Sequence, residues 1–161
     1  MSESTPVRPE QWSANFNARE FASKGREFKP GSREPYRRLV LRALQPIRDH
    51  VGRPVLVVSG QRWPDVNGAV GGASNSRHLP PDDRAPDERD GVAADIRVIG
   101  FSQGQTHALY LWIVDHAEEL GIGAAEFYPE NNFIHVDSRN SSGLVTWADK
   151  SGRAAWEANH V

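Results

Sequence analysis

The chain has no cysteine among its 161 residues, so no disulfide holds the fold and no thiolate serves as a nucleophile or a metal ligand. Any tightly bound metal must therefore use histidine and carboxylate side chains. This argues against a purely structural zinc site, which usually uses cysteine. The sequence also lacks an apolar run long enough to cross a bilayer. The absences direct attention to the six histidines.

The net charge of the chain is also small. The formal net charge is −2 and there is no long basic run, so charge does not suggest a nucleic-acid partner. The opening residues, MSESTPVRPEQWSANFN, have no apolar core and carry both charge signs, so we predict no signal peptide. We expect a soluble protein made in the cytoplasm, with another exit route for any work outside it. With 38% hydrophobic and 25% charged residues, the composition is that of an ordinary globular domain.

We predict a single domain over 15–161 that follows a flexible tail over 1–14. Hydrophobic periodicity predicts two long helices in this domain. The helices are expected over 32–51 and 102–120, where apolar residues recur at helical spacing. Pro46 conflicts with the first helix and is predicted to kink it, because an interior proline costs about 3 kcal/mol. Ser102 is expected to begin the second helix, with a capping box three residues on.

Strand-like runs alternate with these helices. They lie over 54–59, 92–98, 124–128 and 132–137, and the first is predicted to be a buried strand because it is rich in valine. Residues 80–90, PPDDRAPDERD, form an acidic, proline-rich insertion that we interpret as a solvated loop. Its role is either a tolerated surface excursion or an element at the rim of a substrate or partner site.

Two histidines and one aspartate stand in three separate segments: His78 at a loop end, and Asp95 and His135 in predicted strands. Two neutral imidazoles and one carboxylate suit a catalytic zinc ion that leaves its fourth position to water. Period-two geometry turns Asp95 away from the apolar face and puts Asp137 on the face of His135. Neighbouring strands lie about 4.8 Å apart, so two such residues can reach one ion. The residues alone leave other roles open: either histidine could be a surface or packed core residue, and Asp95 could pair with Arg97 or cap a backbone group.

Four sequence pieces occur in one order: SGQR at 59–62, NGAVGGASNSRH at 67–78, AADI at 93–96 and NFIHVD at 132–137. Together they resemble the zinc D-Ala-D-Ala carboxypeptidase family, which shares its metal core with lysostaphin-type peptidases and the hedgehog signalling domain. The resemblance is closest to the small murein-peptidase branch of bacteria and phages. It runs from about residue 15, where NFNAREF is similar to the opening segment of that branch, to about residue 147.

The resemblance implies an α+β fold in which helices pack against a small antiparallel sheet. It implies one Zn²⁺ ion held by His78, Asp95 and His135, and hydrolysis of peptide bonds next to D-amino acids in peptidoglycan stem peptides or cross-links, by a D,D-carboxypeptidase or an endopeptidase. Arg62 matches an arginine that binds substrate and stabilises the oxyanion; without the family, a surface ion pair explains it equally well. Ser76 matches a serine that binds substrate or orients the loop, although a turn serine is the simpler interpretation.

The chain departs from the family at the position of the general base. Many members carry an acidic residue three positions before the last histidine ligand, where this chain has Asn132, which cannot take a proton. Asp137 is the nearest replacement, either as a catalytic base or as a group that orients His135. Glu126 and Glu130 are the next candidates for the general base. The alternative function is a non-catalytic zinc module for cell-wall binding or virion assembly.

The expected surroundings of the protein follow from the resemblance together with its charge and hydropathy. The expected partner is a peptidoglycan peptide, with no nucleic acid and no membrane, and the protein is expected to be a monomer. The missing signal peptide suits a phage endolysin that a holin-like partner releases to the cell wall, or a virion component.

Overall fold

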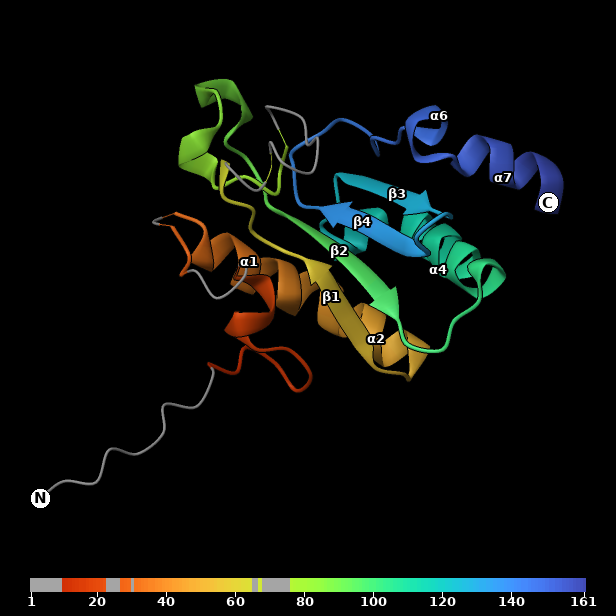
Figure 1. Ribbon diagram of the computed structural model, residues 1–161. Coiled ribbons are helices and arrows are strands. Elements are labelled where there is room, and N and C mark those ends of the chain that lie inside the picture. The colour runs from red at the N-terminus through yellow and green to blue at the C-terminus, as the bar shows by residue number, and fades with distance from the viewer. Residues whose placement is uncertain (1–9, 23–26, 30, 65–66, 68–75) are drawn as a thin grey trace, which may run out of the picture.

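A computed structural model describes residues 10–22, 27–29, 31–64, 67 and 76–161 and contains a four-stranded antiparallel sheet (Figure 1). Residues 1–9 of the expected tail and 68–75 of the glycine-rich loop lie outside the described residues. The sheet order is β1-β2-β4-β3, with bounds Val55–Ser59 (β1), Ala93–Val98 (β2), Ala124–Tyr128 (β3) and Phe133–Asp137 (β4). All neighbouring pairs are antiparallel, which confirms the predicted α+β fold with a small antiparallel sheet.

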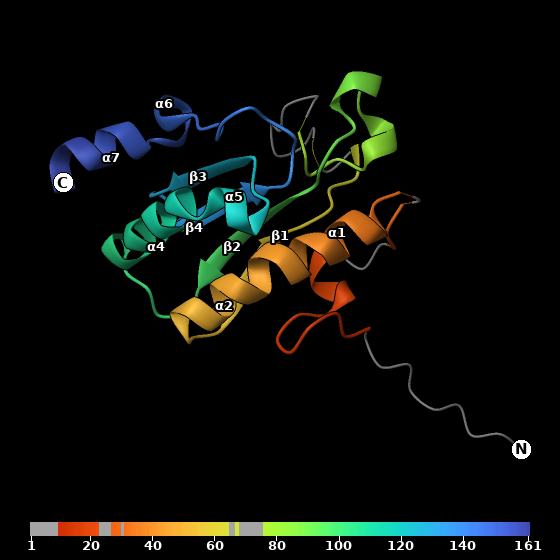
Figure 2. The same ribbon diagram turned by 180° about the vertical axis from the view of Figure 1, so that it is seen from behind.

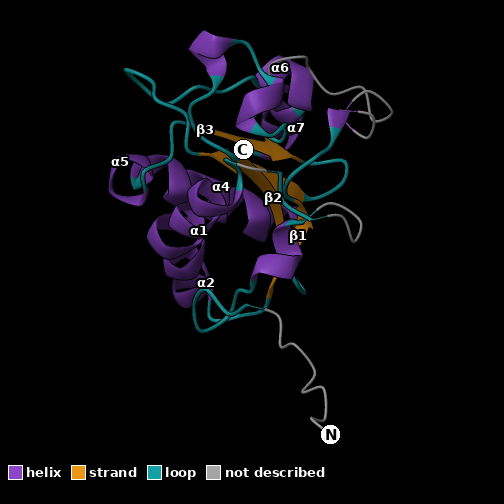
Figure 3. Ribbon diagram, turned by 90° about the vertical axis from the view of Figure 1, so that its left-hand side faces the viewer, coloured by secondary structure: helices purple, strands orange, loops and turns teal. Residues whose placement is uncertain are grey.

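Helices cover one face of this sheet and build the core there (Figures 2 and 3). The inward-facing residues of β2 and β4 alternate with polar ones, so Ala94, Ile96, Ile134 and Val136 are buried beneath the helices. The helical segments on this face are Arg33–Leu39 (α1), Val40–Leu44 (η3), Gln45–Val51 (α2), Gln103–Asp115 (α4) and Ala117–Leu120 (α5). Within the described residues, no helix has both the length and the apolarity that a bilayer crossing requires.

The C-terminal segment packs at β3, the edge strand on the far side from β1 (Figure 1). It consists of the short helices Ala148–Ser151 (α6) and Arg153–His160 (α7). Glu157 of α7 accepts a hydrogen bond from His107 of α4, so the last helix is tied to the helical layer. One further short helix, Ala18–Phe21 (η1), contacts β1.

The predicted helix over 32–51 is present, but Pro46 is accommodated by a π-helical turn. In η3 the amide of Gln45 bonds to the carbonyl oxygen of Val40, five residues back. The wider turn lets Pro46 enter the first turn of α2, where its missing N–H is least costly. The second helix begins as predicted: the Ser102 hydroxyl accepts from the Gln105 amide, and the Gln105 side chain accepts from the Ser102 amide.

Two expectations at the N-terminal side need correction. The strand β1 is not buried on both faces, because Leu56 and Val58 are 46% and 43% exposed on the face away from the helices. An apolar run alone does not distinguish an inner strand from an edge strand. The packed chain also begins before residue 15: Trp12 is buried and stacks on Phe21, with ring centroids 5.7 Å apart.

The insertion over 80–90 is exposed at Asp82, Ala85, Pro86, Asp87 and Arg89, as expected of a solvated loop, but it has local structure that its composition does not predict. It forms two 3₁₀ turns, Pro81–Asp83 (η4) and Pro86–Glu88 (η5), around the side chain of Arg84, which is only 4% exposed. The Arg84 guanidinium donates to the carbonyl oxygens of Leu79, Glu88, Asp90 and Gly91. Hydrogen bonds from one arginine to main-chain carbonyl oxygens thus hold this segment together in place of an apolar core.

Candidate metal centre

His78, Asp95 and His135 converge on the sheet face opposite to the long helices, and all three are buried. Asp95 and His135 are direct partners in the β2–β4 register, so their side chains leave the same face side by side. The segment of His78 is bound along this end of the sheet by main-chain hydrogen bonds from Arg62 N to His78 O and from Ala93 N to Arg77 O. Asp95 and His135, which are 17 and 57 residues from His78 in the sequence, therefore lie next to it in the fold.

The hydrogen bonds of the two histidines fix which ring nitrogen faces the centre of the group. The Nδ1–H of His78 donates to the carbonyl oxygen of Gly60 at 2.7 Å, and this leaves Nε2 facing inward. The Nε2–H of His135 donates to Oδ2 of Asp137 at 2.7 Å, and this leaves Nδ1 facing inward. Metal-binding histidines typically have this arrangement, in which the outer nitrogen donates to a carbonyl or carboxylate oxygen.

The three inward atoms form a nearly equilateral triangle. His78 Nε2 lies 3.1 Å from Asp95 Oδ1 and 3.3 Å from His135 Nδ1. The distance from His135 Nδ1 to Asp95 Oδ1 is 3.0 Å. A tetrahedral ion with bonds of about 2.0–2.1 Å separates its ligand atoms by about 3.3 Å. The group therefore fits a single metal ion of zinc size with little movement of its ligands, and could hold one.

Arg62 binds the remaining oxygen of Asp95. Its Nη2 donates to Asp95 Oδ2 at 3.2 Å, and its Nε donates to Ser59 Oγ at 3.2 Å. Arg97 instead donates to the carbonyl oxygen of Asn131, so it is not the partner of Asp95. Arg62 thus stands beside the three-residue group, with its charge next to the carboxylate.

Asp137 is completely buried, and both of its oxygens are occupied. Oδ2 accepts from His135 Nε2 and Arg139 Nη2, and Oδ1 accepts from Arg139 Nε, the last two at 2.8 Å. Burial raises the pKa of this carboxyl, but hydrogen bonds from His135 and Arg139 outweigh it and hold the pKa below its usual range. Asp137 is therefore a carboxylate with both oxygens engaged, one of them by the outer nitrogen of His135.

The electrostatics of the group place one proton on His135. Burial alone would lower the pKa of His135, yet hydrogen bonds to Asp137 and Asp95 raise it to about 9. Burial lowers the pKa of His78 despite the charge of Asp95, so this ring stays neutral. Burial would raise the pKa of Asp95, but the two histidines keep it well below the usual range.

The remaining sequence candidates have other partners. Asn132 adopts a left-handed conformation (φ 52°) in the β3–β4 turn, and its amide donates to the carbonyl oxygen of Phe101 at 2.9 Å. Glu126 is buried, pairs with Arg153 and accepts from the amide of Trp147. Ser76 Oγ accepts from the His78 amide at 3.2 Å, which steadies the loop before the histidine.

An aromatic wall that the sequence analysis missed borders His135. The ring of Trp147 stands edge-on to the imidazole, with centroids 5.0 Å apart. Its indole N–H donates to the hydroxyl of Tyr128, whose ring stacks on Phe133 at 4.7 Å. Tyr128 and Phe133 are register partners on the same sheet face as His135. Strand periodicity could have placed Tyr128 there, but Trp147 comes from a later loop without such a signal.

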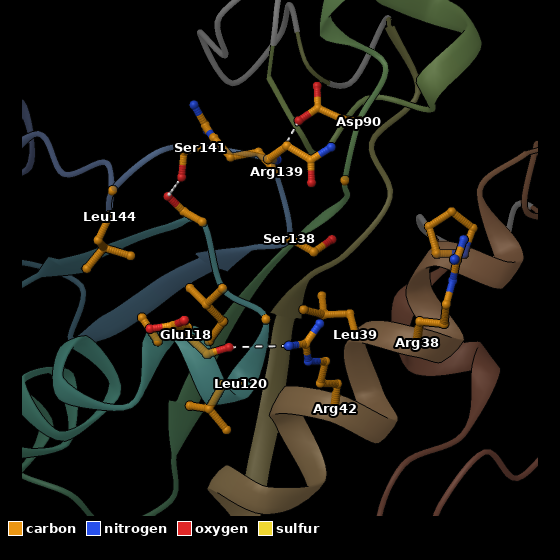
Figure 4. A pocket seen from close by; sticks show the side chains of 18 of the residues that line it. Arg38, Leu39, Arg42, Asp90, Glu118, Leu120, Ser138, Arg139, Ser141 and Leu144 are labelled. Atoms are coloured by element: carbon orange, nitrogen blue, oxygen red, sulfur yellow. Dashed lines mark hydrogen bonds between the residues drawn. The ribbon is translucent and has the colours of Figure 1, made fainter.

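A separate cavity of about 1120 Å³ lies where α1 and α5 meet the loop after β4 (Figure 4). Its lining includes Arg38, Arg42, Glu118 and Arg139, but none of the three clustered residues. Arg139 is the link between the two places, because its guanidinium also binds Asp137. The chemistry of the metal-binding group does not extend into this cavity.

Comparison with known proteins places these residues in a family. The model of the Peptidase M15 family matches residues 14–137, a span that contains His78, Asp95, His135 and Asp137 and stops before Trp147. No curated protein matches this chain.

Proposed function

This chain belongs to the peptidase M15 family, a family of metallopeptidases, and we propose that it is a zinc-dependent hydrolase of peptide bonds next to D-amino acids in peptidoglycan. The observation that carries the proposal is the triangle of inward-facing donor atoms on His78, Asp95 and His135. Both histidines already commit their outer nitrogen to an oxygen acceptor, so the donor set is pre-organised. The activity is that of a D,D-carboxypeptidase or an endopeptidase.

In this proposal Nε2 of His78, Oδ1 of Asp95 and Nδ1 of His135 hold the zinc ion. When bound there, zinc lowers the pKa of a coordinated water to about 7 and polarises a carbonyl group. Arg62 keeps N–H groups beyond those bound to Ser59 and Asp95, and these bind a carbonyl or carboxylate oxygen of the substrate. Of the two roles expected for Asp137, we propose the orienting one, because its oxygens are already occupied. Ser76 supports the loop of His78.

The test combines zinc content with digestion of purified peptidoglycan. We expect wild-type protein to bind one zinc ion and release muropeptides, and His135→Ala to lose both properties. His160→Ala is the matched control, because His160 is exposed and bonds only to its own helix. Bound zinc without released muropeptides would instead support the non-catalytic cell-wall module. Absence of stoichiometric zinc would contradict both functions.

Zinc uptake at neutral pH is expected to release one proton. The folded-state pKa of His135, about 9, lies above its ordinary value of 6.5, so metal-free protein carries the proton at pH 7. That proton stabilises the metal-free fold below about pH 6.5, and this contribution is lost as the pH rises through 9. Zinc must displace it from Nδ1, so the affinity should rise about tenfold per pH unit until about pH 9. Calorimetry in buffers of different ionisation enthalpy measures the release, and a pH-independent affinity would contradict it.

A further inference from the structure

Tyr128 presents a hydroxyl group at the rim of the candidate metal centre. It lies on β3, diagonal to His135 on β4, and long side chains at such positions reach each other across a sheet. Its side chain is partly exposed, and its hydroxyl is bonded to the indole of Trp147, whose ring lies edge-on to His135 with centroids 5.0 Å apart. The face-to-face stack on Phe133, with planes 11° apart, fixes the direction of the ring.

The hydrogen bond from Trp147 determines what this hydroxyl can do. The indole N–H can only donate, so the Tyr128 oxygen is the acceptor and its own proton points elsewhere. Within the residues that the structure describes, no oxygen accepts that proton. Burial raises the pKa of Tyr128, the Trp147 bond opposes this and the charge of Asp95 adds to it, so the hydroxyl is protonated at neutral pH. A directed donor without an acceptor therefore stands beside the candidate metal ligands.

We propose that Tyr128, held by Trp147, is a catalytic residue that donates a hydrogen bond to the scissile carbonyl oxygen and to the oxyanion formed from it. The inference rests on the proposed peptidase function. Water adds to the carbonyl carbon, and the C=O π pair moves to the oxygen, where the Tyr128 O–H binds the new charge. When the pair returns, the C–N bond breaks and the amine leaves with a proton that the water supplied. Tyr128 keeps its own proton throughout, and the charge of Arg62 acts on the same oxyanion.

Trp147 is the positioning residue in this arrangement, and it lies outside the part of the chain that matches the family. Its main-chain amide bonds to Glu126, which also pairs with Arg153 of α7. The C-terminal segment therefore fixes the indole over β3, where its ring also contacts His135. The hydroxyl of Tyr128 is thus oriented by a segment that follows the matched region.

The decisive variant is Tyr128→Phe, which removes the hydroxyl and keeps the stack on Phe133. We expect kcat on muropeptide substrates to fall about 100-fold, as for loss of one oxyanion donor, with KM and zinc affinity unchanged. A phosphinate dipeptide, whose anionic oxygens imitate the tetrahedral oxyanion, should bind about 100-fold more weakly, while the product peptide binds as before. Trp147→Phe should lower kcat about tenfold, because it removes the orienting N–H.

Tyr110→Phe is the matched control, because Tyr110 lies on α4 in the core and should leave kcat unchanged. Equal kcat and equal phosphinate affinity for wild type and Tyr128→Phe would overturn the inference, as would loss of zinc from that variant. If wild-type protein binds the phosphinate but cleaves no peptide, the peptidase function fails. In that case, weaker phosphinate binding by Tyr128→Phe still supports the donor role, and equal binding overturns it.

Discussion

Exchange of Asp95 for asparagine is expected to abolish stoichiometric zinc binding and to lower peptide hydrolysis by on the order of 10³-fold. Oδ1 of Asp95 lies between the inward nitrogens of His78 and His135, and Oδ2 accepts from Arg62. An asparagine side chain fits the same space but offers one oxygen and one NH₂ group. With the NH₂ toward Arg62, donor faces donor; with the NH₂ toward the histidines, the ligand atom is lost. Neither orientation restores the negative charge.

The same exchange should also destabilise the metal-free protein, by about 3 kcal/mol, because a buried ion pair loses one partner. Chelator competition gives the zinc affinity, muropeptide release gives the activity, and urea unfolding of metal-free protein gives the stability. Asp82→Asn is the matched control, since Asp82 is exposed in the insertion and should change none of the three. Wild-type zinc affinity in Asp95→Asn would contradict this prediction and show that other residues hold the metal.

Much of the candidate site follows from strand periodicity. Alternation along β2 and β4 correctly predicts that Asp95 and His135 leave the apolar face, and the antiparallel register makes them neighbours. Periodicity does not predict their partners. The bond from His135 to Asp137 spans only two residues and could be foreseen, whereas the bond from His78 to the carbonyl oxygen of Gly60 depends on how two loops meet.

The position of Asn132 illustrates a different limit. From sequence, this residue is a general base that has lost its carboxylate. In the structure it occupies a left-handed turn position, which asparagine tolerates better than most residues, and its amide bonds to the carbonyl oxygen of Phe101. The demand of the turn explains the residue type without reference to catalysis. A substitution against a family pattern therefore does not by itself indicate lost activity.

The local order of the insertion over 80–90 was not predicted, because its composition is that of a solvated loop. Proline and acidic residues offer no apolar core, and hydrophobic patterning has no means of detecting a core made of main-chain carbonyls. The guanidinium of Arg84 forms this core, because its N–H groups donate to the buried carbonyl oxygen of Leu79 and to the partly buried ones of Glu88 and Gly91. Lys29 adds an ion pair with Asp83 at 2.9 Å.

Replacement of Arg84 by methionine is expected to unfold the insertion locally and to weaken zinc binding. Methionine fills similar space but donates no hydrogen bond, and each carbonyl oxygen left buried and unpaired costs about 1–3 kcal/mol. Two of the lost bonds end on the carbonyl oxygen of Leu79, directly after His78, so the segment that carries this histidine loses one of its anchors. We expect zinc affinity to fall about 10–100-fold, as when a group that orients a ligand is removed.

Hydrogen exchange over 79–91 measures the local opening, and chelator competition measures the zinc affinity. Arg89→Met is the matched control from the same insertion, because Arg89 is exposed and donates only to the carbonyl oxygen of Arg84. Fast exchange with unchanged zinc affinity would mean that the main-chain bonds from Arg62 and Ala93 suffice to hold His78 and its neighbours. Slow exchange in Arg84→Met would refute the carbonyl core itself, since no other described side chain donates to both Leu79 and Gly91.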